Sequence, residues 1–133
     1  PLTWLFYPST TPTVSPGPSL SAAAGFGALS IPIKNGPYAG TVFIVHGNNT
    51  TATSIYYAGG SIAAGPTAPA SIFNGALSFP ITGGAYKGMH MILHGNSTTT
   101  TSIFDPYTLS FISLPSDDLT VIAGIGALVF PAR

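Results

Sequence analysis

The sequence predicts an all-β protein, a β-sandwich of jelly-roll-like character built from two duplicated units of about 48 residues, with an extended N-terminal arm. Three observations support this fold class. The 133 residues include 16 Gly and 13 Pro, which disfavour long helices. Short apolar segments alternate with turn residues at the spacing of roughly 8–12 residues that is typical of sandwiches and barrels. A segment of the chain also returns 48 residues later.

This internal repeat defines the expected organisation of the chain. Residues 27–55 and 75–103 share 18 identities in 29 aligned positions, and the opening returns loosely a third time at 126–131. We therefore expect an arm with a Pro-rich spacer over 1–19 and a sandwich domain over 20–133. Within the sandwich we assign repeat one to 20–69, repeat two to 70–118 and closing strands to 119–133.

The N-terminal region divides into an apolar segment and a spacer. Residues 1–7 are mostly apolar and contain the only Trp, and four Pro follow between positions 8 and 18. Such a Pro density predicts a stiff, extended spacer over 8–19 with no hydrogen-bonding register of its own. At about 3.1 Å per residue the spacer could carry the first segment about 35 Å from the domain.

The strands of the two repeats follow from the turn residues between them. Asn35-Gly36 is a strong hairpin-turn sequence, and Pro115 to Asp118 is a further turn. Two apolar runs, 42–45 and 89–93, lack clean alternation, so we expect them to be covered on both faces. We expect strands near 27–33, 40–46, 51–57, 75–81, 88–94, 99–104 and 107–113, with one or two more in 119–130.

The charge content restricts the partners of the protein. Charged residues make up 5% of the chain, three Lys and Arg against three Asp and no Glu, so the formal net charge is zero. A monomer without charge repulsion should associate unless assembly or covalent sugar keeps it in solution. Three Lys and Arg side chains cannot neutralise many phosphates, so we expect no binding to a nucleic-acid backbone. The longest apolar run, ten residues, is too short for a membrane-spanning helix, and there is no Cys for a thiolate metal site.

The histidines and carboxylates do not form a recognisable catalytic or metal pattern. His90 and His94 lie on one expected strand, where four residues span about 13 Å, so they cannot share an ion. His46 and His94 occupy matching repeat positions, which favours the same structural role for both, at the end of a strand. No Gly-x-Ser-x-Gly sequence occurs. We therefore predict that the protein is not an enzyme and binds no metal or cofactor. A small exposed cleft containing His90 and Asp105 would be needed to support an enzymatic function.

Three asparagines match the N-glycosylation acceptor pattern. They are Asn48, Asn49 and Asn96, and all three lie on expected exposed turns. Sugar at these turns would supply the hydration that charged side chains do not. The alternative is that these residues serve only as turn formers beside β-favouring Thr. Pro1 in place of Met favours a processed, exported chain, so we expect an extracellular or cell-surface protein.

The apolar N-terminal segment is the main candidate for a subunit contact. In an extended chain one face carries Leu2, Trp4 and Phe6, and the other carries Leu5 and Tyr7. We expect this segment to complete the sheet of another subunit, a mode that resembles donor-strand pili in mechanism. Burial of five large side chains would give gross stabilisation on the order of 10 kcal/mol. The alternatives are a first strand in its own sandwich and an arm packed on a symmetric partner.

A head-to-tail contact of this kind does not close on itself and produces a filament. The sequence therefore predicts a structural subunit of an extracellular filament or pilus-like homopolymer. One alternative is a viral coat protein, because duplicated sandwiches with extended arms suit capsids. Another is a carbohydrate- or surface-binding module, in which Tyr38 and Tyr86, at matching repeat positions, would form a stacking platform.

Overall fold

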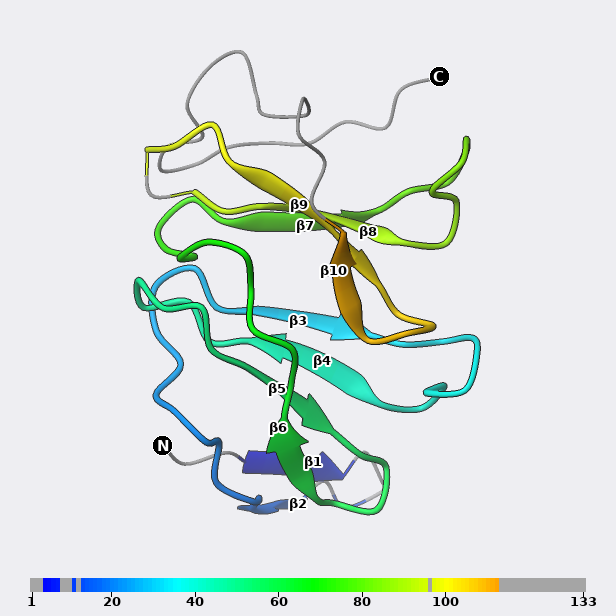
Figure 1. Ribbon diagram of the computed structural model, residues 1–133. Helices are drawn as coiled ribbons and strands as arrows, with labels where there is room; N and C mark the ends of the chain where they lie inside the picture. Colours follow the sequence, from blue (N-terminus) through cyan, green and yellow to red (C-terminus); the bar gives the residue numbers. More distant parts are fainter. Residues whose placement is uncertain (1–3, 8–10, 12, 96, 113–133) are drawn as a thin grey trace.

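The computed structural model of the chain describes residues 4–7, 11, 13–95 and 97–112. In this part of the chain the protein is all-β and contains no helix. Two four-stranded antiparallel sheets pack face to face, and a separate two-stranded sheet lies on the far side of one of them (Figure 1). The predicted all-β class and the two packed layers of a β-sandwich are therefore confirmed.

Each four-stranded sheet comes from one continuous stretch of chain. The first sheet consists of β3 (Leu29–Pro32), β4 (Val42–Val45), β5 (Thr53–Tyr56) and β6 (Ile62–Ala64). The second consists of β7 (Leu77–Pro80), β8 (His90–Leu93), β9 (Thr101–Asp105) and β10 (Ser110–Ile112). Strands that are neighbours in the chain are neighbours in the sheet, so both sheets are antiparallel meanders. The predicted jelly-roll character is wrong for these strands, because short connections return each strand beside its predecessor before the chain changes sheet.

The two sheets share their register over their first three strands. Leu29 stands opposite Val45 in the first sheet, and Leu77 stands opposite Leu93, each 48 positions later, in the second. The next pairs, β4 with β5 and β8 with β9, are related by the same shift. The last pair differs: Tyr56 faces Ile62, whereas Phe104 faces Phe111, one residue beyond the position that the shift would give.

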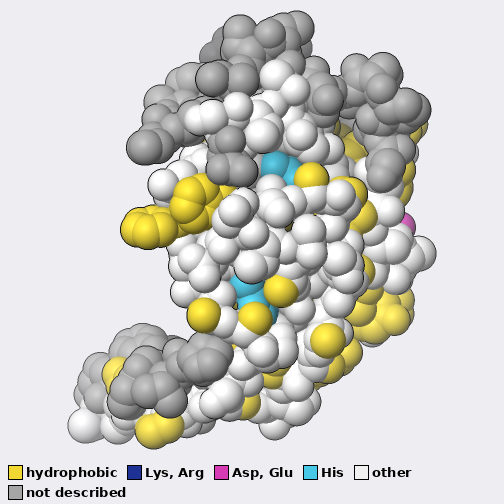
Figure 2. Space-filling view, turned by 60° about the vertical axis from the view of Figure 1, so that its left-hand side comes forward, with side chains coloured by type: hydrophobic (Ala, Val, Ile, Leu, Met, Phe, Trp, Pro, Cys, Tyr) yellow, Lys and Arg dark blue, Asp and Glu magenta, His cyan; other side chains and the backbone are white. Residues whose placement is uncertain are grey.

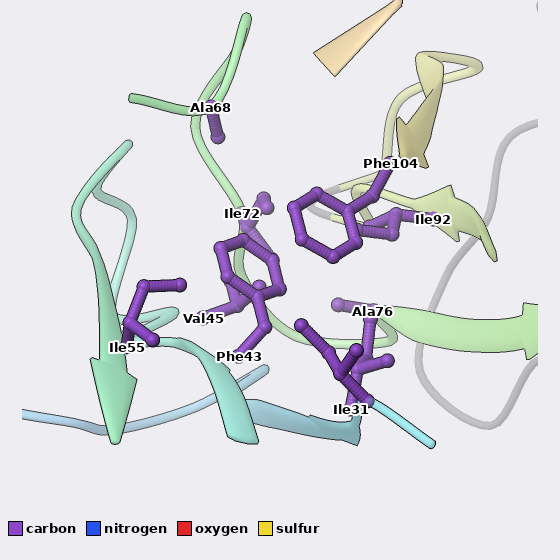
Figure 3. Packing of buried hydrophobic residues seen from close by; sticks show 10 residues of the cluster. Ile31, Phe43, Val45, Ile55, Ala68, Ile72, Ala76, Ile92 and Phe104 are labelled. Carbon is purple, nitrogen blue, oxygen red and sulfur yellow. The ribbon is translucent and has the colours of Figure 1, made fainter. Parts of the chain in front are cut away.

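The core lies between the two sheets (Figure 3). Phe43 of β4 and Phe104 of β9 meet at its centre with ring centroids 3.9 Å apart and planes 9° from parallel. Phe111 of β10 packs beside both rings, at 5.9 Å from Phe43 and 5.7 Å from Phe104. Phe43 and Phe104 are fully buried and Phe111 is half-buried; full burial of such a side chain contributes about 1.5–3 kcal/mol, so these rings help to hold the sheets together. The other fully buried members are Ile31, Val45, Ile55, Ile72 and Ile92.

A close backbone contact also joins the two sheets. Gly27, just before β3, has a φ of 80°, and a side chain placed on it would collide with the backbone of Phe73. Thr50 and Ile72 form an isolated antiparallel bridge nearby. The turn after β4 is tight as well, since Gly47, Asn48 and Asn49 all have positive φ. Gly and Asn are the residues that tolerate this conformation best.

The N-terminal segment pairs with its own spacer. β1 (Trp4–Tyr7) and β2 (Thr13–Pro16) form an antiparallel hairpin in which Trp4 stands opposite Pro16. The expected absence of any hydrogen-bonding register in the spacer is therefore wrong. Thr13, Val14 and Ser15 keep their backbone donors and have side chains that suit a strand, so the prolines limit the strand without preventing it.

Several expectations fall outside the described residues. These are the strands predicted in 119–130, the loose third copy at 126–131 and the position of Leu2. In the described part, no helix is long and apolar enough to cross a membrane.

Candidate functional site

The N-terminal hairpin is the first candidate site. The backbone of Trp4, Leu5, Phe6 and Tyr7 forms β1, and β2 covers one edge of that strand. Neither strand lies next to a strand of the two larger sheets. Figure 1 shows the hairpin on the side of the first sheet that faces away from the second. Among the described strands, β2 alone pairs with β1, so the other edge of β1 is where a further strand would add.

The turn after β4 brings two of the three candidate asparagines to the surface. Asn48 and Asn49 are both exposed there. The backbone N–H of Asn48 donates to the carbonyl oxygen of Phe26 at 2.8 Å, and the Thr50 hydroxyl donates to that of Gly47 at 2.8 Å. The expected exposed turn is confirmed for these two residues, while their glycosylation stays a prediction. Asn96, the third candidate, lies outside the described residues.

Two histidines form matching pairs with serines. The Nε2 atom of His46 lies 2.8 Å from the Ser54 hydroxyl, and that of His94 lies 2.8 Å from the Ser102 hydroxyl. All four side chains are buried. Each pair joins the residue after one strand to a residue of the next strand, so it fixes the turn between them. This arrangement agrees with the structural role that we expected for both histidines at a strand end.

The chemistry open to these pairs is limited by burial. Ser54 and His46 are each 0% exposed, so a substrate cannot reach the hydroxyl. Burial lowers the pKa of His46 below its ordinary value, because the charged imidazolium would lose its hydration. Its Nδ1 atom has no hydrogen-bond partner, so no carboxylate orients the ring as a catalytic triad requires. No group of three metal-binding side chains occurs among the residues that the structure describes.

A pocket that sequence reasoning missed lies between the ends of the two sheets. Its volume is about 380 Å³. Tyr107 forms one wall and packs over Gly36, where a side chain would collide with the ring. The lining residues are Pro32, Ile33, Lys34, Asn35, Pro80, Gly88, His90, Pro106 and Tyr107. They come from distant parts of the chain, so no local sequence pattern could have identified the pocket.

His90 is the only titratable imidazole in this lining. Its Nδ1 atom is buried without a hydrogen-bond partner, and burial lowers its pKa. Asp105 is not part of the lining. Its carboxylate instead accepts hydrogen bonds from the Tyr107 backbone N–H and the Thr108 hydroxyl, both at 2.8 Å. An enzymatic function was expected to require a cleft that contains both His90 and Asp105. This pocket contains only His90 of the two.

The two tyrosines of the expected stacking platform are only partly accessible. Tyr38 and Tyr86 are both half-buried, and Tyr38 packs against the hydrophobic core. A platform for sugar rings needs aromatic faces open to solvent. The carbohydrate-binding alternative gains no support from these positions.

The described surface carries little charge. Lys34 and Lys87 are exposed, whereas Asp105 is buried. In the space-filling view, hydrophobic and uncharged polar groups dominate the visible face (Figure 2). Comparison of the chain with protein-family models, with curated proteins and with solved structures finds no match.

Proposed function

We propose that the protein is a structural, non-enzymatic subunit of an extracellular filament, and that the N-terminal segment of one copy binds to the next copy. The observation that carries this proposal is the separate hairpin β1–β2. A two-stranded hairpin is at best marginally stable in water by itself. This hairpin contains Trp4, Leu5, Phe6 and Tyr7, and no strand of the larger sheets lies beside it. A neighbouring subunit that added a strand to β1 would stabilise it.

The composition supports assembly over a dispersed monomer. A formal net charge of zero leaves little repulsion between copies. A contact between the hairpin of one copy and a sheet edge of the next uses two different surfaces, so it continues without closing. We further propose that the sandwich arose by duplication of one β unit, since sheets of equal strand order come from the two similar sequence segments.

Glycans on the exposed turns would suit an extracellular filament of this composition. Asn48 and Asn49 are the accessible acceptors, and Asn96 holds the matching position in the second segment. The proposal predicts that the intact mass of native material exceeds 13.5 kDa. An unmodified mass would remove the glycan part of the proposal and leave the filament part in place.

Deletion of residues 1–8 tests the filament itself. We expect the truncated chain to be secreted with its β-sheet circular dichroism retained, and to form no fibres in electron micrographs. A matched control carries Pro8→Gly and Thr10→Gly, which keep β1 and should leave polymerisation intact. Normal fibres from the truncated chain would contradict strand donation. Closed shells from the full chain would instead favour the viral-coat alternative.

A further inference from the structure

We propose that the pocket between the ends of the two sheets binds a small aromatic carboxylate. Such a site goes beyond the proposed filament and does not depend on it. The pocket has a volume of about 380 Å³, which lies within the range of about 300–1,000 Å³ that is usual for ligand sites. We call it the end pocket.

The end pocket lies where three hairpin turns come together. Figure 1 shows the turns β3–β4, β7–β8 and β9–β10 at the same end of the two sheets. Each turn contributes to the lining: Lys34 comes from the first, Gly88 from the second and Tyr107 from the third. A concave site on which a few polar groups converge is the arrangement that small-molecule ligands use.

The side chain of His90 points into the space between the sheets. His90 stands opposite Pro80 on β7 and opposite Phe104 on β9. Directly opposed residues share a face of a sheet, and Phe104 stacks on Phe43 of the first sheet. The imidazole therefore lies on the face of β8 that is turned toward the first sheet, where it forms part of the wall of the end pocket.

One nitrogen of His90 is available to a ligand. The Nδ1 atom is buried without a hydrogen-bond partner, and the Nε2 atom is not closed off in this way. Buried N–H groups without an acceptor are rarer in proteins than acceptors without a full set of donors, so we place the ring proton on Nε2. Burial lowers the pKa of His90, so the imidazole is neutral at about pH 7. His90 therefore offers an uncharged N–H donor to the pocket.

Lys34 supplies the positive charge of the end pocket. Its side chain is exposed, and none of the described lining residues is acidic. Asp105 is the only acidic residue in the described part of the chain, and both of its carboxylate oxygens already accept hydrogen bonds. The ammonium group is therefore available to an anion, and one positive charge suits a singly charged group such as a carboxylate.

The remaining walls of the end pocket are apolar. Pro32, Pro80 and Pro106 contribute rings that carry no N–H donor. Tyr107 adds an aromatic ring that is 50% exposed although it packs over Gly36. Aromatic rings attract each other in offset or edge-to-face contacts, so this ring suits a ligand that carries a ring of its own. An aromatic carboxylate uses both the apolar walls and the two donors.

The polar groups of the end pocket depart from the internal repeat. The residues at the matching positions, 48 away in the sequence, are Thr82 for Lys34 and Val42 for His90. Val42 and His90 each stand opposite a proline at the end of the preceding strand, so the backbone register is the same. The chain therefore supplies its own replacement residues for a test. Lys34→Thr and His90→Val each insert the residue that the other sheet accommodates at that position.

Ligand-observed ¹⁹F NMR with 4-fluorobenzoate tests the site on the full chain, dispersed or assembled, because it observes the probe. We expect saturable binding at one site per chain with a Kd of about 1 mM or lower. 4-Fluorobenzyl alcohol, which has the same ring and no charge, should bind at least about tenfold more weakly, because it forms no charged pair with Lys34. Equal affinity for the two probes would overturn the proposal, as would the absence of saturable binding of 4-fluorobenzoate.

Two substitutions locate the site, with circular dichroism as the check on folding. Lys34→Thr should raise the Kd for 4-fluorobenzoate at least about tenfold and leave that for the alcohol unchanged, since it removes the charge. His90→Val should raise the Kd about threefold to tenfold, because one neutral hydrogen bond is lost. Lys87→Ala is the control: it removes the other described lysine, which is outside the lining, and inserts the residue of the matching position, Ala39.

The control variant should leave the Kd for 4-fluorobenzoate unchanged. An equal loss of affinity in Lys87→Ala would indicate general attraction to positive charge and would overturn the proposal. Unchanged affinity in either Lys34→Thr or His90→Val would overturn it as well. If a variant loses its β-sheet spectrum, the comparison of the two probes on the natural chain still decides whether the site selects a carboxylate.

Discussion

The last hairpins of the two sheets have similar sequences at their start and opposite surroundings. Tyr56 of β5 is half-buried and faces Ile62, whereas Phe104 of β9 is fully buried and faces Phe111. Their strands share order and register up to this point, so the difference comes from what lies against them. The second sheet packs on the first sheet, whereas among the described strands no second four-stranded sheet lies on the opposite side of the first (Figure 1). Burial here is therefore a property of the stack and not of the strand sequence.

Truncation of the two aromatic residues should separate these surroundings most strongly. We expect Phe104→Ala to lower the free energy of unfolding by about 3–5 kcal/mol, because it leaves a cavity against Phe43. Tyr56→Ala should cost less than about 1.5 kcal/mol in a dispersed chain, since that side chain is only half-buried. Urea unfolding of both variants measures the difference. Equal losses would mean that Tyr56 is packed as tightly as Phe104 in the isolated molecule.

Gly27 tests how closely the two sheets are held. We expect Gly27→Ala to destabilise the protein by at least about 2 kcal/mol, from the positive φ and from the collision with the Phe73 backbone. Gly40 has a φ of 86° and open space around it, so Gly40→Ala isolates the conformational cost of about 1–2 kcal/mol. Thermal unfolding provides the comparison. If both variants melt at the same temperature, the contact at Phe73 contributes nothing.

The two serine–histidine pairs should respond alike. Ser54→Ala and Ser102→Ala each remove the partner of a buried imidazole nitrogen at 2.8 Å. We expect a loss of about 1–3 kcal/mol in each variant, because the nitrogen keeps its desolvation cost without its hydrogen bond. Chemical denaturation of the two single variants checks this. A loss confined to one of them would show that the pairs differ in role despite equal geometry.

Acidification should lower the stability of the fold by less than the substitutions above. Burial lowers the pKa of His46 and His90 below 6.5, so the unfolded chain binds protons more readily than the folded one. Their contribution to stability is complete above about pH 6.5 and falls as the pH drops through the lowered folded values. We expect a lower melting temperature at about pH 5 than at about pH 7.5, and a smaller difference in His46→Gln. A melting temperature that rises on acidification would contradict this assignment.

The sequence predicted the strands that have strong turns beside them. The expected segments 27–33, 40–46 and 51–57 contain β3, β4 and β5, because Gly and Asn with positive φ mark the ends of these strands. β2 and β6 were not expected: prolines flank the first, and the second contains two alanines with little β-propensity. Their pairing depends on neighbours that a local pattern does not contain.

The candidate sites were predictable to different extents. The exposed turn at Asn48 follows from its own sequence, since the residues that form a turn are adjacent. The pocket beside His90 does not, because Tyr107 and Lys34 meet only after the sheets pack. The different burial of Ile44 and Ile92, at matching repeat positions, likewise depends on how the sheets pack and not on the local sequence.

The meander order of each sheet has a consequence for how a chain of this design could change in length. Each strand-to-strand ladder of the two larger sheets closes within one continuous stretch of chain, and the bridge between Thr50 and Ile72 links the first stretch to the second. A whole layer could therefore be inserted between two existing ones at the cost of re-forming one bridge, without rethreading any ladder. The number of stacked sheets could then increase one at a time, while the strand order within each sheet stays the same.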